Sequence, residues 1–209
     1  MNLVVDIDGV LARFVPAYIR TIVESSGRDL FLPDDVTHWP RWDTEVLRGY
    51  TPEEIRKVWW RIETTPDFWF GLEPITENTE PLAAVIHVLA RRHNVYFVTQ
   101  RSGLFVKRQT ELWLEKYLNH TGNTVLIVRS HSKGQICHAL NIDVFVDDKY
   151  SNCTDVVSES PSTRVYLIDT TWNRGPEISR IKKIEDRRIR NLSDMLHDEG
   201  LVYTGMSSM

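Results

Sequence analysis

The first apolar run of the chain is short and ends in acidic residues. Leu3, Val4 and Val5 are consecutive apolar residues, and Asp6 and Asp8 follow them closely. A short apolar run bounded in this way is typical of a buried strand in a parallel sheet. Open α/β sheets bind ligands at the carboxyl ends of such strands. The pattern alone leaves two interpretations open: a strand that ends in an acidic turn, or a strand that presents carboxylates to a ligand.

A helical period follows this strand, and then the character of the chain changes. Apolar residues at helical spacing predict a helix over 14–26. Residues 28–78 contain most of the tryptophans and show no strand alternation. Within them, Thr51 is followed by a proline and two glutamates, an N-cap pattern that predicts a helix over 52–63. We interpret 68–75 as the return link of a small helical cap, inserted after the first strand and helix.

From Glu80 onward, helical and strand patterns alternate. Helices are predicted over 81–92, 106–118, 133–140 and 192–197, and strands over 95–98, 125–128, 144–146 and 165–168. Strands that alternate with helices in this way favour an α/β fold with a doubly wound parallel sheet. The predicted organisation is a core of residues 1–27 and 79–203, a cap of residues 28–78 between its two parts, and a loose tail at 204–209.

Composition restricts the class of protein further. The 209 residues fit one domain with an insertion, and the hydrophobic share of 42% is ordinary for a globular chain. A net charge of −4 does not favour an extended nucleic-acid or membrane surface. The two cysteines, Cys137 and Cys153, lack a metal-type spacing, and no leader or long apolar stretch is visible. We expect a cytoplasmic protein with a small-molecule partner and no membrane contact; whether it forms a homodimer is left open.

Polar residues end three of the predicted strands. Asp6 and Asp8 follow the first strand, Thr99 the second, and Asp147 and Asp148 a later one. Because parallel strands share one polarity, these residues are expected at the same edge of the sheet. Four carboxylates gathered there would repel one another without a cation. Mg²⁺ suits this set, because it accepts oxygen ligands together with waters and a substrate phosphate.

The motifs Asp6-Ile-Asp8-Gly-Val, Thr99, Lys133 and Asp147-Asp148 occur in an order that resembles the four motifs of the haloacid dehalogenase-like (HAD) phosphatase superfamily. The resemblance covers the core and implies the HAD-like Rossmannoid fold. It implies that Asp6 is the catalytic nucleophile, which takes the phosphoryl group as an aspartyl-phosphate. It also implies that Asp8 is the acid that protonates the leaving oxygen and then the base that activates water.

The same resemblance implies the metal ligands. Mg²⁺ would be held by Asp6, by the backbone carbonyl of Asp8 and by Asp147. Asp148 would ligate the ion or orient a water bound to it. The structural alternative for Asp148 is an N-cap or a partner of Lys149.

Thr99, Gln100 and Lys133 are the candidates for binding the phosphoryl oxygens. Backbone N–H groups near Asp8 and Gly9 are expected to donate to the same oxygens. A solvated charge is the structural alternative for Lys133, and a turn cap is the alternative for Thr99.

A narrower resemblance links the chain to the 5′(3′)-deoxyribonucleotidases. Residues 65–75, Trp113-Leu-Glu-Lys-Tyr117 and Trp172-Asn-Arg174 are similar to segments of that family. The chain departs from the family at Asn78, where a glycine is usual, and at Gln100, where a small residue is common. These departures bear on the substrate more than on the chemistry.

In that family, aromatic residues of the cap form the nucleobase pocket. Phe68 and Trp69 stand at the matching place, and Trp69 is the first candidate for stacking on a base. Core packing is the favoured interpretation for Trp59 and Trp60 on their predicted helix, and Trp113 is assigned to packing.

Together these features predict a Mg²⁺-dependent phosphomonoesterase of small nucleotides, above all deoxyribonucleoside monophosphates. Two alternatives remain at this point: a phosphatase for another small phosphoester, such as a sugar phosphate or a nucleic-acid end, and a non-catalytic nucleotide-binding module. The sequence leaves open whether Arg174 reaches the substrate or pairs with a surface acid.

Overall fold

A six-stranded sheet forms the centre of the computed structural model, which describes residues 1–27, 49–129, 131–174 and 181–201. All paired strands are parallel, and their order across the sheet is β3-β2-β1-β4-β5-β6. The strands are β1 (Asn2–Val5), β2 (Asn94–Thr99), β3 (Thr124–Ile127), β4 (Val144–Asp147), β5 (Arg164–Ile168) and β6 (Arg188–Ile189). The predicted parallel sheet is therefore confirmed, with β6 as an additional edge strand.

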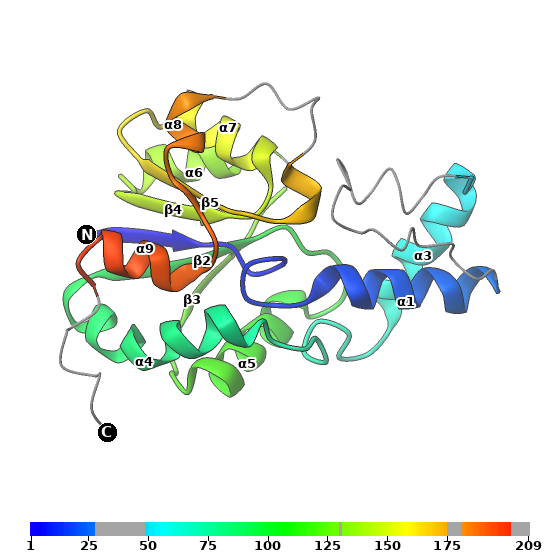
Figure 1. Cartoon of the computed structure of the whole chain (residues 1–209). Helices are drawn as coiled ribbons and strands as arrows, with labels where there is room; N and C mark the ends of the chain where they lie inside the picture. Colours follow the sequence, from blue (N-terminus) through cyan, green and yellow to red (C-terminus); the bar gives the residue numbers. More distant parts are fainter. Residues whose placement is uncertain (28–48, 130, 175–180, 202–209) are drawn as a thin grey trace.

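Helices cover both faces of this sheet. Figure 1 shows α6 (Lys133–Ala139), α7 (Tyr150–Glu159) and α8 (Lys182–Glu185) on one face, and α4 (Thr76–Arg92), α5 (Val106–Leu118) and α9 (Leu192–Asp198) on the other. The fold is therefore the doubly wound α/β arrangement that the alternating patterns predict.

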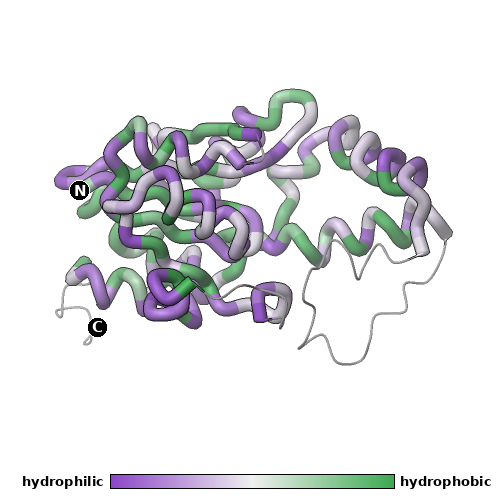
Figure 2. The backbone as a smooth tube through the Cα atoms, turned by 90° about the horizontal axis from the view of Figure 1, so that it is seen from above, coloured by the Kyte–Doolittle hydropathy of each residue, from purple (hydrophilic) through white to green (hydrophobic). Residues whose placement is uncertain are grey.

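The strands alternate their side chains between two apolar clusters. In β1, Leu3 and Val5 belong to the cluster beneath α4, α5 and α9, whereas Val4 belongs to the cluster beneath α6, α7 and α8. A strand buried on both faces appears in the sequence as a continuous apolar run, which explains why these three residues show no polar alternation. Figure 2 shows mostly hydrophobic segments within the core, while polar and apolar residues alternate along the outer helices.

Two helices extend beyond the sheet beside the carboxyl end of β1 (Figure 1). They are α1 (Phe14–Ser26) and α3 (Pro52–Thr64), and both match their predicted positions closely. A capping box at Thr51 starts α3, as the sequence pattern predicts. An ion pair of 2.7 Å between Arg61 and Glu24 joins the two helices.

The core resumes earlier than predicted after the cap. α4 begins at Thr76 and contains Pro81, at which the predicted helix begins. Its first turn is held by the buried side chain of Asn78, which donates to the carbonyl oxygen of Val10 at 2.6 Å and accepts from the N–H of Leu192 at 2.7 Å. The predicted boundary between residues 78 and 79 therefore lies inside a helix of the core.

Parts of the predictions fall beyond the structural description. Residues 28–48, which include Trp39 and Trp42, lie outside the described residues, as does the tail at 204–209. Within the described ranges, no helix combines the length and the apolar character needed to cross a lipid bilayer.

Candidate active site

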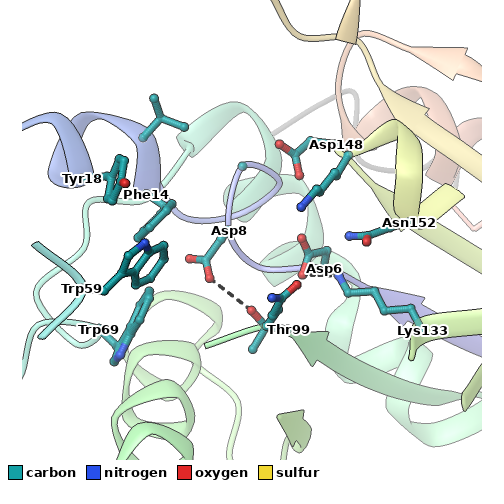
Figure 3. Close-up of a pocket in the computed structure, with 14 residues that line it drawn as sticks. Asp6, Asp8, Phe14, Tyr18, Trp59, Trp69, Thr99, Lys133, Asp148 and Asn152 are labelled. Carbon is teal, nitrogen blue, oxygen red and sulfur yellow. Dashed lines mark hydrogen bonds and ion pairs between the residues drawn. The ribbon is translucent and has the colours of Figure 1, made fainter. Parts of the chain in front are cut away.

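The carboxyl end of β1 lies at the switch point of the sheet. β1 is paired with β2 on one side and with β4 on the other, and the chain leaves β1 toward the cap. A cavity of about 300 Å³ opens at this point. Figure 3 shows its two sides: Asp6, Asp148, Asn152 and Lys133 form a polar side, and four aromatic residues lie opposite. This is the place at which doubly wound folds bind their ligands.

Three of the predicted residues form a buried ionic group at the base of the cavity. Lys133 Nζ lies 2.8 Å from Asp6 Oδ1 and 2.7 Å from Asp147 Oδ2, and all three side chains are less than a tenth exposed. Lys133 comes from the first turn of α6, and Asp147 ends β4. Lys133 is therefore a buried, paired cation, and the solvated charge considered from the sequence is excluded.

Asp147 has further hydrogen-bond partners from α7 and the turn before it. Asn152 Nδ2 lies 3.1 Å from Oδ1 and 3.0 Å from Oδ2 of Asp147, and the N–H of Lys149 donates to Oδ1 at 2.8 Å. Asn152 also lines the cavity. These donors fix the carboxylate plane of Asp147 before any ligand binds.

Asp148 is held from a different part of the chain. Its Oδ2 accepts a hydrogen bond of 2.8 Å from the indole N–H of Trp172, and its carbonyl oxygen accepts one of 2.8 Å from Asn173. Both donors belong to a short 3₁₀ helix, η2 (Thr171–Asn173). On the other side, Gly9 approaches so closely that a Cβ atom at its position would lie 2.2 Å from Asp148 Oδ2.

Asp8 belongs to a second ionic group, on the side of β2. Arg101 donates to both of its oxygens, from Nε to Oδ2 and from Nη2 to Oδ1, each at 2.8 Å. Thr99 Oγ1 donates to Asp8 Oδ2 at 3.1 Å, the contact dashed in Figure 3. Asp6 and Asp8 both line the cavity, whereas Ile7 between them is completely buried.

The aromatic side of the cavity comes from α1 and the cap. Phe14 stacks on Trp69 with ring centroids 5.5 Å apart and lies 6.1 Å from Trp59, which also contacts Tyr18 (Figure 3). Trp69 is only 2% exposed, and Arg101 lies over its ring at 4.9 Å. Trp59 is half-buried. Trp59 is therefore more exposed than Trp69, the residue that the sequence made the first candidate for base stacking, although both line the cavity.

Several other predicted residues occupy different positions from those expected. Phe68 is not among the described residues that line this cavity, and it contacts the edge of the Trp69 ring from behind. Trp60 is 66% exposed, so the core packing expected for it is wrong. Trp113 is fully buried as expected, and Arg174 pairs with the surface acid Asp169 at 2.6 Å.

The loop after β1 contains a backbone hydrogen bond that the sequence does not predict. The N–H of Gly9 donates to the carbonyl oxygen of Ala12 at 2.9 Å, so it is already used within the loop. Donation from the backbone N–H groups near Asp8 and Gly9 to phosphoryl oxygens stays a prediction. Gln100, in contrast, lines the cavity together with Thr99, as expected for candidates that bind phosphate.

Burial dominates the electrostatics of the site. Desolvation raises the pKa of Asp6 to about 7, against the opposing charge of Lys133. Desolvation and the neighbouring charge of Asp147 also raise the pKa of Asp148 well above its usual value. For Lys133, burial by itself lowers the pKa, but the charges of Asp147 and Asp6 outweigh it and raise the pKa.

The buried carboxylates fit a hard divalent cation. Asp6, Asp147 and Asp148 each offer an oxygen within 4.8 Å of the others. Oδ1 of Asp6 is buried and accepts no hydrogen bond of normal geometry, although it is ion-paired with Lys133. Three carboxylates facing one ammonium leave an excess of buried negative charge, which is costly unless another cation offsets it. Oxygen ligands of this kind suit Mg²⁺.

Three side chains that donate hydrogen bonds to the predicted carboxylates are not predicted from the sequence. Arg101, Asn152 and Trp172 lie within hydrogen-bond distance of Asp8, Asp147 and Asp148, respectively. Arg101 stands two residues after Thr99, just beyond the end of β2, and this position does not indicate its contact with Asp8. For Trp172 the tertiary contact spans 24 residues and leaves no local pattern.

Comparisons with known proteins identify the family of the chain. The family model described as 5′ nucleotidase, deoxy (pyrimidine), cytosolic type C protein matches residues 1–189. A protein of Halalkalibacterium halodurans assigned as a nucleotidase is 24% identical over 179 residues, which cover 86% of this chain and 85% of that protein. A nucleotidase of Clostridium acetobutylicum is 30% identical over 96 residues, 44% of this chain and 46% of that protein.

Solved structures share the fold. A protein of Lactobacillus plantarum assigned as a phosphoglycolate phosphatase superposes with a TM-score of 0.60 at 16% identity, over 94% of this chain and 97% of that one. A HAD hydrolase of Bacillus subtilis, solved with bound magnesium, superposes with a TM-score of 0.54 at 13% identity, over 94% and 97% of the two chains. At these identities the likeness concerns the fold.

Proposed function

Because the chain belongs to the 5′ nucleotidase, deoxy (pyrimidine), cytosolic type C family, and is a phosphoric monoester hydrolase of the HAD type, we propose that it hydrolyses small nucleotides with Mg²⁺. Deoxyribonucleoside monophosphates are the proposed substrates. The observation that carries this proposal is a cavity of about 300 Å³ in which aromatic rings face the carboxylates of Asp6 and Asp8. Such a cavity offers one side to a base and the other to a phosphate.

In the proposed reaction, Asp6 and Asp8 share the bond changes. A carboxylate oxygen of Asp6 attacks phosphorus, and the bond between phosphorus and the leaving oxygen breaks as Asp8 donates a proton to that oxygen. Asp8 then takes a proton from a water molecule, whose oxygen attacks the phosphorus of the aspartyl-phosphate. Inorganic phosphate leaves, and the free carboxylate of Asp6 is restored.

Neighbouring residues supply charge and orientation for these steps. Lys133 lies 2.8 Å from Asp6 and offsets the repulsion between this carboxylate and a phosphate. Thr99 and Gln100 line the cavity and are the proposed donors to phosphoryl oxygens. Asp6, Asp147 and the backbone carbonyl of Asp8 would hold Mg²⁺, with Asp148 ligating the ion or orienting a water bound to it. When bound, the cation neutralises negative charge that develops on the phosphoryl oxygens.

For the base, Trp59 is the proposed stacking surface. It is half-buried at the cavity wall, whereas Trp69 is almost completely enclosed by Phe14, Phe68 and Arg101. Stacking of a base on an aromatic ring contributes about 1–3 kcal/mol. Trp69 then serves as the support on which Phe14 rests.

The test is a substrate panel assayed with Mg²⁺ and with a chelator. Nucleoside monophosphates carrying phosphate at the 5′ or 3′ position, sugar phosphates and p-nitrophenyl phosphate are compared by kcat/KM. We expect nucleotides to be preferred over sugar phosphates, and chelation to abolish all activity. Equal rates with and without metal would contradict the proposed Mg²⁺ dependence, and a preference for sugar phosphates would contradict the proposed substrate class.

The matched control is Asp6→Asn, which keeps the size of the side chain and removes the nucleophile. We expect no turnover of any substrate and a thermal unfolding midpoint at least as high as that of the parent protein, since Asn carries no buried charge. Retained turnover by this variant would remove Asp6 from its proposed role.

A further inference from the structure

Arg101 makes a bidentate ion pair with Asp8, the proposed acid, and the guanidinium of this pair is buried. Its side chain has no exposed surface, whereas the side chain of Asp8 is 16% exposed. Two hydrogen bonds of 2.8 Å run in parallel from the guanidinium to the two carboxylate oxygens. A pairing of this kind fixes both the position and the plane of the carboxylate.

The guanidinium is itself held on its other sides. Nη1 donates to Thr110 Oγ1 of α5 at 2.9 Å, and the group lies over the ring of Trp69 at 4.9 Å. Trp69 in turn donates from its indole N–H to the carbonyl oxygen of Ser102 at 2.9 Å. Arg101 therefore joins Asp8 to a helix of the core and to the wall of the cavity.

Arg101 does not touch the cavity in the part of the chain that the structure describes. The lining includes Asp8, Thr99 and Gln100, but Arg101 lies behind them with its side chain enclosed. Direct contact with a substrate phosphate is therefore excluded for this conformation. Any effect of Arg101 on turnover has to pass through a residue that it contacts.

We propose that Arg101 is a positioning residue for Asp8, an inference that rests on the proposed function. Asp8 lies in the loop beyond β1, where only Arg101 and Thr99 donate to its side chain among the described residues. Proton transfer to a leaving oxygen requires the carboxyl group within hydrogen-bond distance and in the correct orientation. The guanidinium fork supplies this orientation from outside the cavity.

The test variant is Arg101→Lys, which keeps a positive charge beside Asp8 but loses the planar fork. The measurement is kcat/KM, which covers the steps up to the departure of the leaving group. Three substrates separate the explanations: a nucleoside 5′-monophosphate, a sugar phosphate without a base, and p-nitrophenyl phosphate, whose phenolate leaves without protonation.

We expect kcat/KM to fall by about 10²-fold for the nucleotide and for the sugar phosphate, because both need a positioned acid. For p-nitrophenyl phosphate we expect a loss of less than about tenfold on the same argument. A similar loss on all three substrates would overturn the proposal in favour of a structural role. A loss confined to the nucleotide would overturn it in favour of a role through Trp69.

A double-mutant comparison distinguishes an effect of Arg101 that passes through Asp8 from a general loss of structure. If Arg101 acts through Asp8, then Arg101→Lys introduced into Asp8→Asn should leave the residual kcat/KM for the sugar phosphate unchanged. A further loss in the double variant would contradict the proposal. A stability control is Arg164→Lys, since Arg164 makes a bidentate pair with Glu199 at the opposite edge of the sheet, although its side chain is more exposed than that of Arg101. The thermal unfolding midpoint of this variant shows how much stability is lost when a bidentate arginine pair is disrupted away from the site.

Failure of the proposed function gives a different result. If the parent protein hydrolyses none of the three substrates, the proposed function is wrong. If the parent protein is active and Arg101→Lys behaves like Arg164→Lys on every substrate, only the positioning role is wrong.

Discussion

Gly9 occupies the point at which the loop after β1 passes closest to the carboxylate cluster. Its φ of +85° lies in the left-handed region, and Asp148 Oδ2 occupies the space that a Cβ atom would need. Both conditions select glycine, one through the backbone and the other through packing. The close approach brings the loop that carries Asp8 against the residue that follows β4. The short distance between the loop that carries Asp8 and Asp148 thus depends on the absence of a side chain at Gly9.

We expect Gly9→Ala to lower kcat by about 10²-fold, because Asp148 has to move away from the position in which Trp172 holds it. The measurement is kcat with a nucleoside monophosphate at saturating Mg²⁺. Gly122→Ala is the matched control, since Gly122 has a φ of +79° but no atom within 4 Å of its Cβ position. In both variants an alanine has to adopt a positive φ, but only at Gly9 would its Cβ atom meet Asp148. An equal effect of the two substitutions on kcat would therefore contradict a role for the contact with Asp148.

At the scale of elements, Asn78 joins three segments that are distant in the sequence. It is part of the first turn of α4, and its side chain binds the loop after β1 and the beginning of α9. The side chain is buried, so its two partners have no water to replace it. Through Asn78, α9 thereby supports the loop that carries Asp8.

Replacing Asn78 by Ala leaves the carbonyl of Val10 and the N–H of Leu192 without their partner. Each buried polar group that loses its hydrogen bond costs about 1–3 kcal/mol of unfolding free energy. At about 2–4 °C per kcal/mol for a chain of this size, the thermal unfolding midpoint should fall by several degrees. Asn94→Ala serves as the control, because Asn94 bonds Asn2 at the exposed surface. A shift no larger than that of the control would contradict the buried role of Asn78.

At the scale of the whole molecule, the carboxylate cluster couples stability to pH and to metal. Burial raises the pKa of Asp6 to about 7, so the folded protein holds this proton more tightly than the unfolded chain. The contribution is stabilising below about pH 4 and is lost as the pH rises to about 7. A divalent cation held by these carboxylates would replace the proton and offset the same charge.

We therefore expect Mg²⁺ to raise the thermal unfolding midpoint more at pH 8 than at pH 5, because at pH 5 it competes with protons for the cluster. The measurement is a thermal melt of the metal-free protein with and without Mg²⁺ at each pH. Asp148→Asn should reduce the effect of Mg²⁺, whereas Asp194→Asn, in α9 away from the cavity, should not. An equal Mg²⁺ effect in the parent protein and Asp148→Asn would contradict a role for Asp148 in the cation site.

The sequence predicts the elements whose patterns are strong and local. α1 and α5 have their predicted bounds, and the carboxyl ends of the adjacent strands β1, β2 and β4 bring Asp6, Thr99 and Asp147 to the same side of the sheet, as expected. α7 was not predicted, because its polar residues have weak helix propensity and packing against β4, β5 and α6 stabilises it instead. β6 is too short for a periodic signal and depends on its pairing with β5.

The same distinction applies to the site. Residues that carry the proposed chemistry stand in short motifs, so the sequence alone indicates Asp6, Asp8 and Lys133. Residues that orient them are brought in by the fold from distant positions. Arg101 lies 93 residues beyond Asp8, and no spacing rule connects the two. The burial of Trp69 could not be predicted either, because it depends on tertiary contacts with Phe14 and Arg101.

The bond from Asn78 to Leu192 spans 114 residues and has a consequence for the synthesis of the protein on the ribosome. The strand that precedes Asp6 is translated well before α9, the helix that Asn78 joins to the loop after β1. A nascent chain that lacks α9 exposes the carbonyl of Val10 and the apolar face of α4, which α9 packs against. We therefore expect a nascent chain that has not yet reached α9 to hold the loop after β1 less firmly and to be prone to aggregation through its exposed apolar surface.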